Sequence, residues 1–261
     1  MTVATTRPDS ISTTTSTLIP SSTGFDKIDL RLTDWTVRHD HMLSIHHRSS
    51  HKIPTLLFRT STGPVFGYGA HYKSNWWYLN IIVPRPGIRH CLLGFNASRF
   101  ENLINYPAAD PALVRRAVAE LGRQLPQIGI ESDLSSAVVR RLEVCSDIPV
   151  DNCLEAYWEV LEDCPPPSRM RKRRRNNGIS WFNGRSAIKA YGKYYELRHR
   201  YGAAADNLIM PDSNTVRFES AVLTPAAVRN KLEVDNLNRI DELHGAALTW
   251  HLKTWEGILE G

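Results

Sequence analysis

The stretch GISWFNGRSAIKAYGKYYEL, residues 178–197, decides how this chain can fold. Two short apolar runs within it, residues 178–182 and 187–190, flank the dipeptide Asn183-Gly184. Asn-Gly between two such runs is the strongest short-range signal for a β-hairpin, in which a tight turn joins two antiparallel strands. The stretch therefore predicts an antiparallel pair of strands, around which the rest of a sheet has to be placed.

Further strands are predicted on both sides of this hairpin, because short apolar or alternating runs are bounded by turn residues. They cover residues 25–32, 65–68, 76–83, 89–95, 138–145 and 215–223. Apolar residues at helical spacing follow three helix-start signals, Asp110-Pro111, Asp151 and Thr224-Pro225, and they also cover residues 234–259. The predicted fold class is therefore α+β, a mainly antiparallel sheet covered by helices.

The chain divides into three predicted parts. Residues 1–24 are rich in Ser and Thr and predict a disordered tail, since they bury too little apolar surface to offset the entropy of ordering. Residues 25–235 form the main domain, with a basic linker at 165–177, and residues 236–261 form a C-terminal helix. No run approaches the ~20 apolar residues of a membrane helix and no secretory signal is found, so we expect a cytoplasmic protein without a membrane partner.

The charge of the chain favours an anionic partner. The formal net charge is +5 at pH 7 and the isoelectric point is near 9.1. Neither G-x-G-x-x-G nor G-x-x-x-x-G-K-[ST] occurs, so the sequence offers no glycine-rich phosphate loop. The four cysteines lack the paired spacing of a zinc site and fit thiols of a reducing compartment.

Chemically distinctive residues concentrate between residues 180 and 219. Ser180-Trp181 comes first, followed by Ala190-Tyr191-Gly192-Lys193-Tyr194-Tyr195-Glu196-Leu197 and by Val216-Arg217-Phe218-Glu219. This series resembles the replication initiators of filamentous phages, the gene II/gene X family, which carry a T-W stretch, an A-Y-x-K-x-x-E-L segment and V-R-F-E. The resemblance implies a fold similar to the HUH-like rolling-circle replication initiator endonucleases, acting in a bacterial host on a phage or plasmid.

The resemblance also implies a nucleophile. The family's A-Y-x-K tyrosine maps onto Tyr191, which would attack a phosphodiester, stay joined to the 5′ phosphate and free a 3′ hydroxyl. A tyrosine is only ~0.1% ionised at pH 7 and needs a base, a cation or a metal nearby, and Lys193 offers such a cation. In a strand over residues 189–195, Tyr191 and Lys193 share one face. In a helix, Tyr191 instead shares a face with Tyr194 and Tyr195, and the sequence leaves both cases open.

Acidic residues on separate predicted elements indicate a metal site. Carboxylates suit Mg²⁺ or Mn²⁺, which polarise a scissile phosphate, and the candidate carboxylate ligands are Glu143, Glu196 and Glu219. The family's histidine in a Q-G-H-N segment has no clear counterpart at Ile104-Asn105, and His90 on a predicted strand is the substitute that the chain offers. Structural ion pairs explain the same glutamates equally well, through their neighbours Arg141, Arg200 and Arg217.

A dense basic run predicts the DNA contacts, because each neutralised phosphate adds to the affinity and to its salt dependence. Aromatic residues beside it can stack on unpaired bases. The predicted DNA-binding residues are Arg169, Arg171, Lys172, Arg173, Arg174, Arg175, Trp181, Lys189 and Arg217. A solubilising loop or a targeting signal explains the basic run as well, and core packing explains Trp181 and Tyr191.

Two classes of function follow. The first is a tyrosine-dependent, metal-assisted endonuclease and strand transferase that nicks single-stranded or supercoiled origin DNA, with a host helicase and a single-strand-binding protein as further partners. The second is a protein that binds origin DNA or RNA without cleaving it. A transposase or relaxase with the same tyrosine chemistry is a third interpretation.

Overall fold

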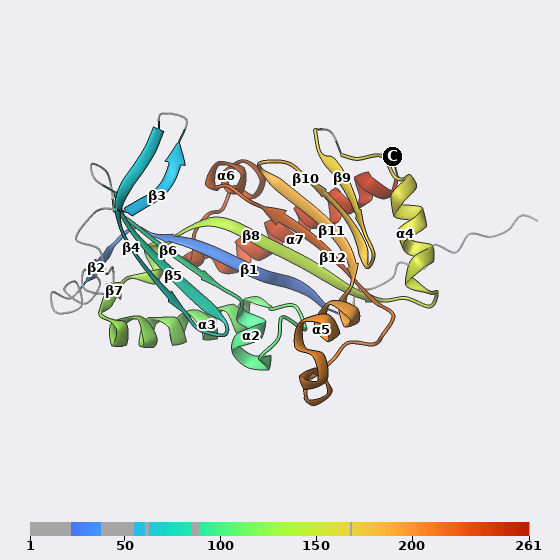
Figure 1. The fold of residues 1–261 in the computed structure, drawn as a ribbon, viewed down its shortest axis with the longest axis horizontal. Helices are drawn as coiled ribbons and strands as arrows, with labels where there is room; N and C mark the ends of the chain where they lie inside the picture. Colours follow the sequence, from blue (N-terminus) through green and yellow to red (C-terminus); the bar gives the residue numbers. More distant parts are fainter. Residues whose placement is uncertain (1–21, 38–54, 61–62, 85–88, 168, 261) are drawn as a thin grey trace, which may run out of the picture.

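A computed structural model describes residues 22–37, 55–60, 63–84, 89–167 and 169–260. Its centre is a ten-stranded sheet of antiparallel neighbours in the order β3-β4-β5-β6-β1-β8-β12-β11-β10-β9 (Figure 1). The strands are β1 (Ser22–Leu32), β3 (Thr55–Thr60), β4 (Gly63–Lys73), β5 (Trp77–Pro84), β6 (His90–Phe95), β8 (Val138–Pro149), β9 (Arg171–Arg175), β10 (Gly178–Phe182), β11 (Ser186–Gly192) and β12 (Thr215–Val222). Two short strands, β2 (Trp35–Val37) and β7 (Ile130–Ser132), pair separately.

Helices cover one face of this sheet. The described helices are α2 (Ala97–Asn102), α3 (Pro111–Gln124), α4 (Leu154–Asp163), α5 (Lys193–Tyr201), α6 (Pro225–Leu232) and α7 (Ile240–Leu259). Apolar side chains of α3, α6 and α7 form one core with β1, β6 and β8, and those of α4 and α7 form a second core with β10, β11 and β12. Figure 1 shows α7 running behind the strands and α5 beside their lower ends, so the front face of β8, β12, β11 and β10 stays open.

A buried histidine joins α7 to the two middle strands. His251 is 1% exposed, and its two ring nitrogens lie 3.0 Å from the Ser146 hydroxyl of β8 and 2.9 Å from the Ser220 hydroxyl of β12. Burial lowers the pKa of His251 to about 4, so the ring is neutral at pH 7. The neighbours of Ser146 and Ser220 along each strand face the opposite side of the sheet, where the site lies.

The predicted fold class is confirmed. The hairpin of β10 and β11 forms as expected, although its turn is displaced by one residue: the Asn183 amide donates to the Ser186 carbonyl at 3.0 Å, which leaves Gly184 and Arg185 in the middle. The Asn183 side-chain oxygen accepts from the amides of both Arg185 and Ser186. Helix α3 begins at Pro111 with Asp110 as its N-cap, whose carboxylate accepts from the Leu113 amide at 2.7 Å.

Two strands differ from the prediction: one begins earlier than expected, and the other lies in a segment predicted as a linker. Strand β1 begins at Ser22, where we expected order from Phe25, because Ser22 to Gly24 pair with β8. The rest of the predicted tail, residues 1–21, lies outside the described residues. The basic linker contains β9, which pairs with β10 along its whole length at the edge of the sheet. Arginines suit an edge strand because their charge discourages pairing with a further strand.

Two helix starts differ from the prediction. Helix α4 begins at Leu154 after Cys153, so Asp151 does not cap it. Residues 234–236 are not helical, because the Asp235 carbonyl accepts from the Val139 amide at 2.6 Å and Asn236 bridges Val138 at the start of β8. The C-terminal helix α7 therefore begins only at Ile240.

Candidate functional site

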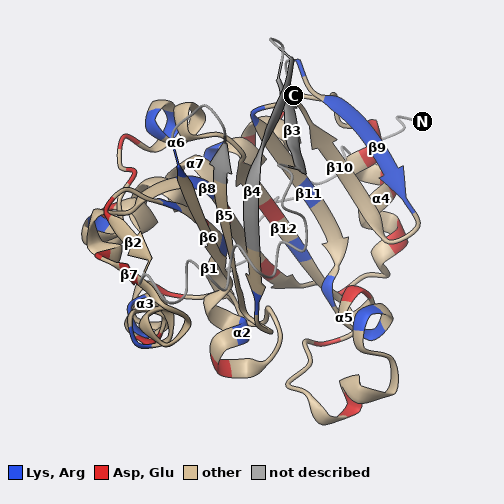
Figure 2. Cartoon of the chain, turned by 60° about the vertical axis from the view of Figure 1, so that its left-hand side comes forward, with Lys and Arg blue, Asp and Glu red and all other residues tan. Residues whose placement is uncertain are grey.

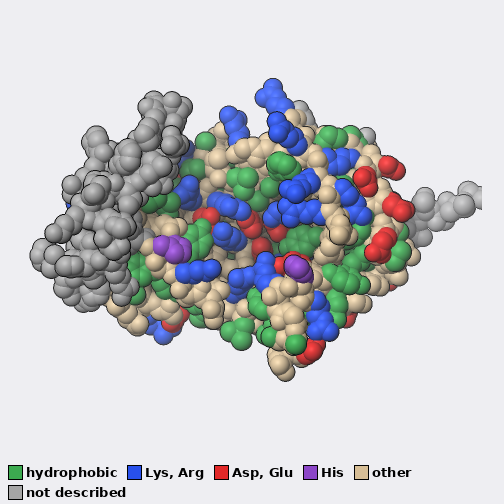
Figure 3. All heavy atoms as spheres, in the orientation of Figure 1, with side chains coloured by type: hydrophobic (Ala, Val, Ile, Leu, Met, Phe, Trp, Pro, Cys, Tyr) green, Lys and Arg blue, Asp and Glu red, His purple; other side chains and the backbone are tan. Residues whose placement is uncertain are grey.

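A hollow of about 970 Å³ lies on the open face, over β10, β11 and β12. The two-residue period of a strand sorts the side chains of β11: Lys189 and Tyr191 line the hollow, whereas Ile188 is buried in the core against the helices. Figure 3 shows Lys and Arg side chains surrounding a small group of acidic side chains in the middle of this face. The hollow is therefore an acidic centre within a basic rim.

Three buried carboxylates form that centre. Asp26 of β1, Glu143 of β8 and Glu219 of β12 each place an oxygen within 4.8 Å of the other two. Asp26 reaches this position through a β-bulge, since Phe25 pairs with Val144 and the next paired residue, Lys27, with Glu143. Three hard oxygen donors so close together can hold a divalent metal ion of the Mg²⁺ or Mn²⁺ type.

The charges of this cluster are only partly compensated. Burial, and then the charges of Glu219 and Asp26, raise the pKa of Glu143 to about 7. Burial also acts to raise the pKa of Asp26, but Arg217, Lys193 and Lys189 outweigh it and hold that pKa below its ordinary value. The cluster therefore has an affinity for a proton near neutral pH, and a metal ion would compete for the same place.

Tyr191 contacts the cluster directly. Its hydroxyl donates to the Glu219 carboxylate at 3.1 Å, and the amine of Lys189 forms an ion pair with the other oxygen of the same group. Burial, and then the negative charge of Glu219, raise the pKa of Tyr191 well above its ordinary value. The hydroxyl is therefore protonated in this state, and Glu219 is placed to accept its proton.

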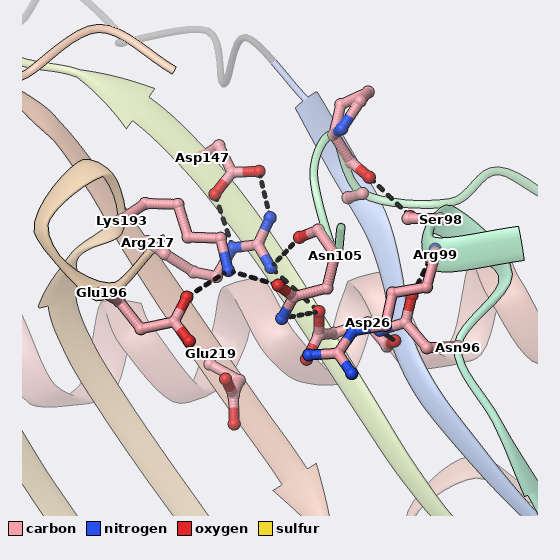
Figure 4. Close-up of polar contacts among 12 residues, drawn as sticks. Asp26, Asn96, Ser98, Arg99, Asn105, Asp147, Lys193, Glu196, Arg217 and Glu219 are labelled. Carbon is pink, nitrogen blue, oxygen red and sulfur yellow. Dashed lines mark hydrogen bonds and ion pairs between the residues drawn. The ribbon is translucent and has the colours of Figure 1, made fainter. Parts of the chain in front are cut away.

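Arg217 lies beneath the cluster and is fully buried. Its guanidinium binds both oxygens of Asp147 at 2.6 Å, and it donates to the Asp26 carboxylate and to the Asn105 carbonyl at 2.8 Å (Figure 4). The prediction that Arg217 contacts DNA is wrong, because it has no solvent exposure and its donors are engaged within the protein. Its role here is to fix Asp26 and to keep that carboxylate ionised.

Lys193 is also buried, at the first position of α5. For residues 189–195 the sequence left strand and helix open. The chain is a strand up to Gly192 and a helix from Lys193, so neither predicted geometry holds throughout. The Lys193 amine donates to the Asn105 side chain at 3.0 Å and to Glu196 at 2.9 Å, and it lies 5.8 Å from the centre of the Tyr191 ring. Burial, and then the charge of Arg217, lower its pKa.

Two predicted metal ligands lie outside the cluster. Glu196 pairs with Lys193 and, at 2.6 Å, with Arg200, as the ion-pair interpretation held. His90 pairs with Ile82 at the far end of β6, whereas the Phe95 end of that strand is opposite Ile28. Seven residues of strand register separate it from Asp26, which corresponds to roughly 24 Å. His90 is therefore not a ligand of this cluster.

The basic strand β9 has two different faces. Figure 2 shows it as an almost continuous band of positive charge at the edge of the sheet. Arg173 and Arg175 line the hollow. Lys172 and Arg174 instead bind the end of α4: the Lys172 amine donates to the Cys164 carbonyl at 2.8 Å, and Arg174 forms an ion pair with Glu162 at 3.5 Å. The basic residues that remain free for an anionic ligand are therefore Arg173 and Arg175 in the hollow and the exposed Arg169 and Arg171.

Trp181 is a core residue, and the prediction that it contacts DNA is wrong. It is fully buried, and its ring packs edge-to-face on Trp255 of α7 at a centroid distance of 5.9 Å. The alternation of β10 turns the next residue, Phe182, to the open face, where 39% of it is exposed and it lines the hollow. Phe182 is therefore the aromatic side chain of this strand that a ligand in the hollow can contact.

Sequence reasoning missed Asp26 and Asp147. In a regular strand over residues 25–32, Asp26 lies on the same face as Ile28, Leu30 and Leu32, so the prediction places an acid on an apolar face. That conflict was the available signal, and the bulge resolves it. Asp147 lies beyond the predicted end of its strand at residue 145, and nothing in the sequence marked it.

No protein-family model matches the chain, and no curated protein matches it either. Among solved structures, it is similar to one described as the structure of a rolling circle replication initiator protein from Geobacillus stearothermophilus. The identity is 10%, the match covers 79% of this chain and 76% of that chain, and the TM-score is 0.37. Among the described residues, no helix is long and apolar enough to cross a membrane.

Proposed function

We propose that this protein nicks and rejoins DNA through Tyr191, as a rolling-circle replication initiator of a phage or plasmid does. The observation that carries the proposal is the hydrogen bond from Tyr191 to Glu219, a member of a three-carboxylate cluster in a hollow with a basic rim. A phosphodiester entering this hollow is drawn by the rim and meets a nucleophile that already has a proton acceptor. A host helicase and a single-strand-binding protein belong to the same proposal.

The chain's own residues supply the steps of the transfer. The Tyr191 proton passes to Glu219 as the phenolic oxygen attacks the phosphorus. A bond from Tyr191 to the 5′ phosphate forms, the bond from phosphorus to the 3′ oxygen breaks, and the freed 3′ oxygen takes up a proton. Lys189, beside Glu219 and partly exposed, is placed to stabilise charge on the phosphate. The reverse reaction rejoins the ends.

Asp26, Glu143 and Glu219 fit a resident Mg²⁺ or Mn²⁺, because they offer three clustered hard donors and Glu143 is not fully compensated by the cations around it. Such an ion supplies Lewis-acid polarisation of the scissile phosphate. Arg217 and Lys193 contribute indirectly, since they hold Asp26 and Asn105 in place from below.

The test is covalent capture on a denaturing gel. A random-sequence single-stranded library and a supercoiled plasmid, each incubated with protein and Mn²⁺, serve as substrates. Because Tyr191 keeps the 5′ phosphate, a strand labelled at its 3′ end should leave its label on the protein, and a strand labelled at its 5′ end should not.

Two variants give the test its specificity. Tyr191→Phe should abolish the labelled species, whereas Tyr157→Phe, on the half-buried face of α4 and away from the hollow, should retain it. A labelled species that survives in Tyr191→Phe would refute the assignment of the nucleophile. Salt-sensitive binding without any covalent species would favour a non-catalytic binding protein, and capture only on defined element ends would favour a transposase or relaxase.

A further inference from the structure

A second, smaller hollow of about 290 Å³ adjoins the first. It lies over β1, β5 and α2, on the opposite side of the carboxylates from the basic strand β9. Asp26, Asn105 and Glu143 line both hollows. The carboxylate cluster therefore stands at the junction of two adjoining spaces, and a strand whose phosphate lies at the junction has to continue on both sides.

Two cations of the second hollow have no counter-ion among the residues that the structure describes. Of its four basic residues, Lys27 is 3.5 Å from Asp29 and Arg200 is 2.6 Å from Glu196. Within the described part of the chain, Arg99 and Lys73 form no ion pair, and the Arg99 Nε is buried without a hydrogen-bond partner. A half-buried guanidinium that lacks an acceptor is costly unless a ligand supplies one.

The surroundings of Arg99 hold it in position. The Asn96 side-chain oxygen accepts from the Arg99 amide at 2.8 Å at the start of α2, and the Asn96 amide group donates to the Asp26 carbonyl. Figure 4 shows the Arg99 side chain extending from α2 toward the side of the site where Asp26 lies. A planar guanidinium can donate two parallel hydrogen bonds to two oxygens of one phosphate.

Aromatic side chains complete the smaller hollow. Trp76 and Tyr78 line it, and Trp76 is supported from behind by Phe100 at a centroid distance of 4.9 Å. Both residues are only partly buried, so their rings offer surface to a ligand. Unpaired bases stack on such rings, whereas the paired bases of a duplex are already stacked on each other.

We propose that the smaller hollow binds the nucleotides on the far side of the scissile phosphate in single-stranded DNA, with Arg99 holding a backbone phosphate and Lys73 assisting at the rim. The proposal rests on the proposed function for the position of the cut, and it adds a second binding subsite with its own phosphate-binding residue. The substrate strand then runs from β9, past Tyr191 and the carboxylates, into the smaller hollow that Trp76 lines.

The test measures binding, not cleavage, and uses the Tyr191→Phe protein throughout so that no strand is cut. Fluorescence anisotropy with a labelled 20-nucleotide oligothymidylate gives the Kd at several salt concentrations. Arg99→Gln should weaken binding about tenfold, and the slope of log K against log salt should become shallower by about 0.7, the loss of one phosphate contact to a single strand. Lys73→Gln should weaken binding about threefold, since its charge is more exposed to solvent.

The matched control is Arg123→Gln, an equal change at a 74% exposed arginine on α3, which should leave the Kd and the slope unchanged. Arg173→Gln, on the other side of the carboxylates, should lose a similar slope, and the double variant with Arg99→Gln should lose the sum. Circular dichroism checks that each variant is folded. If Arg99→Gln is unfolded, the Kd and the salt slope of Lys73→Gln decide whether the second subsite exists.

Wild-type affinity and slope in both Arg99→Gln and Lys73→Gln would overturn the proposal, as would two oligonucleotides bound per protein, because one strand is required to fill both hollows. The outcome is independent of the covalent assay. A protein that never forms the tyrosine adduct but loses affinity in Arg99→Gln would refute the proposed catalysis and support the second subsite.

Discussion

Replacing Arg217 with methionine should destabilise the protein severely, without removing any group from the surface. Methionine has a similar length and no charge, so the change removes the buried cation that pairs with both Asp147 and Asp26. Removing one member of a buried ion pair costs about 3–5 kcal/mol. Because Arg217 serves two carboxylates here, we expect a loss of about 5 kcal/mol, a large part of a typical total of roughly 5–15 kcal/mol.

The loss should depend on pH in a definite direction. In the parent protein Arg217 helps to hold the pKa of Asp26 below 3.8, so this carboxylate contributes stability above that pH and loses it as pH falls through the folded pKa. Without Arg217, burial is opposed by fewer cations and the pKa of Asp26 rises. Asp26 then takes up a proton in mild acid, which relieves the buried charge, so the difference between variant and parent should shrink from pH 7 toward pH 4.

Urea unfolding followed by circular dichroism at pH 7 and pH 4.5 measures both effects. The control is Arg116→Met, which removes an exposed arginine paired with Glu101 and should cost less than about 1 kcal/mol at either pH. A loss below about 1 kcal/mol for Arg217→Met at pH 7, or a loss that grows toward acid, would refute the reasoning.

Two further predictions concern the cluster and the strand beside it. The raised pKa of Glu143 means that its folded form binds a proton more tightly than its unfolded form, so stability is lost as pH rises from 4.5 through about 7. Glu143→Gln should therefore be more stable than the parent at pH 8 by up to about 3 kcal/mol and equal to it at pH 4. Mn²⁺ should raise the Tm of the parent only. Thermal unfolding with and without Mn²⁺ checks both results, and equal pH profiles of the two proteins would contradict the first. Trp181→Ala should cost about 3–5 kcal/mol of stability because its ring is buried in the core. Phe182→Ala should leave the urea midpoint nearly unchanged and weaken binding of oligothymidylate by about 1–3 kcal/mol. The reverse pattern would show that the two faces of β10 are misassigned.

Local signals in the sequence predicted the elements that depend on local chemistry. The Asn183-Gly184 dipeptide located the hairpin, and Asp110-Pro111 located the start of α3, because turns and caps are decided within a few residues. Glu143 and Glu219 were found as candidate ligands because acids on separate strands stand out. The fold class followed from the order of these elements.

Other features depend on contacts that the sequence does not display. The sequence predicts Arg217 as a DNA contact, because its buried partner Asp147 is 70 residues away and no local pattern connects the two. It predicts a linker for the arginines of β9, because their pairing with β10 involves backbone groups and leaves no apolar pattern. It predicts His90 as a ligand, but strand register, which no single segment reveals, places His90 at the wrong end of β6.

The three clustered carboxylates have a consequence for the order of events during synthesis. Asp26 belongs to β1 and Glu219 to β12, so the acidic centre joins residues from nearly opposite ends of the described chain. Contacts of such long sequence separation form late, because closing a long loop costs entropy that only the finished sheet offsets. A ribosome-bound chain that has not yet reached Glu219 lacks the group that accepts the Tyr191 proton. The nicking activity proposed for this fold would thus remain off until β12 has emerged and paired with its neighbours in the sheet.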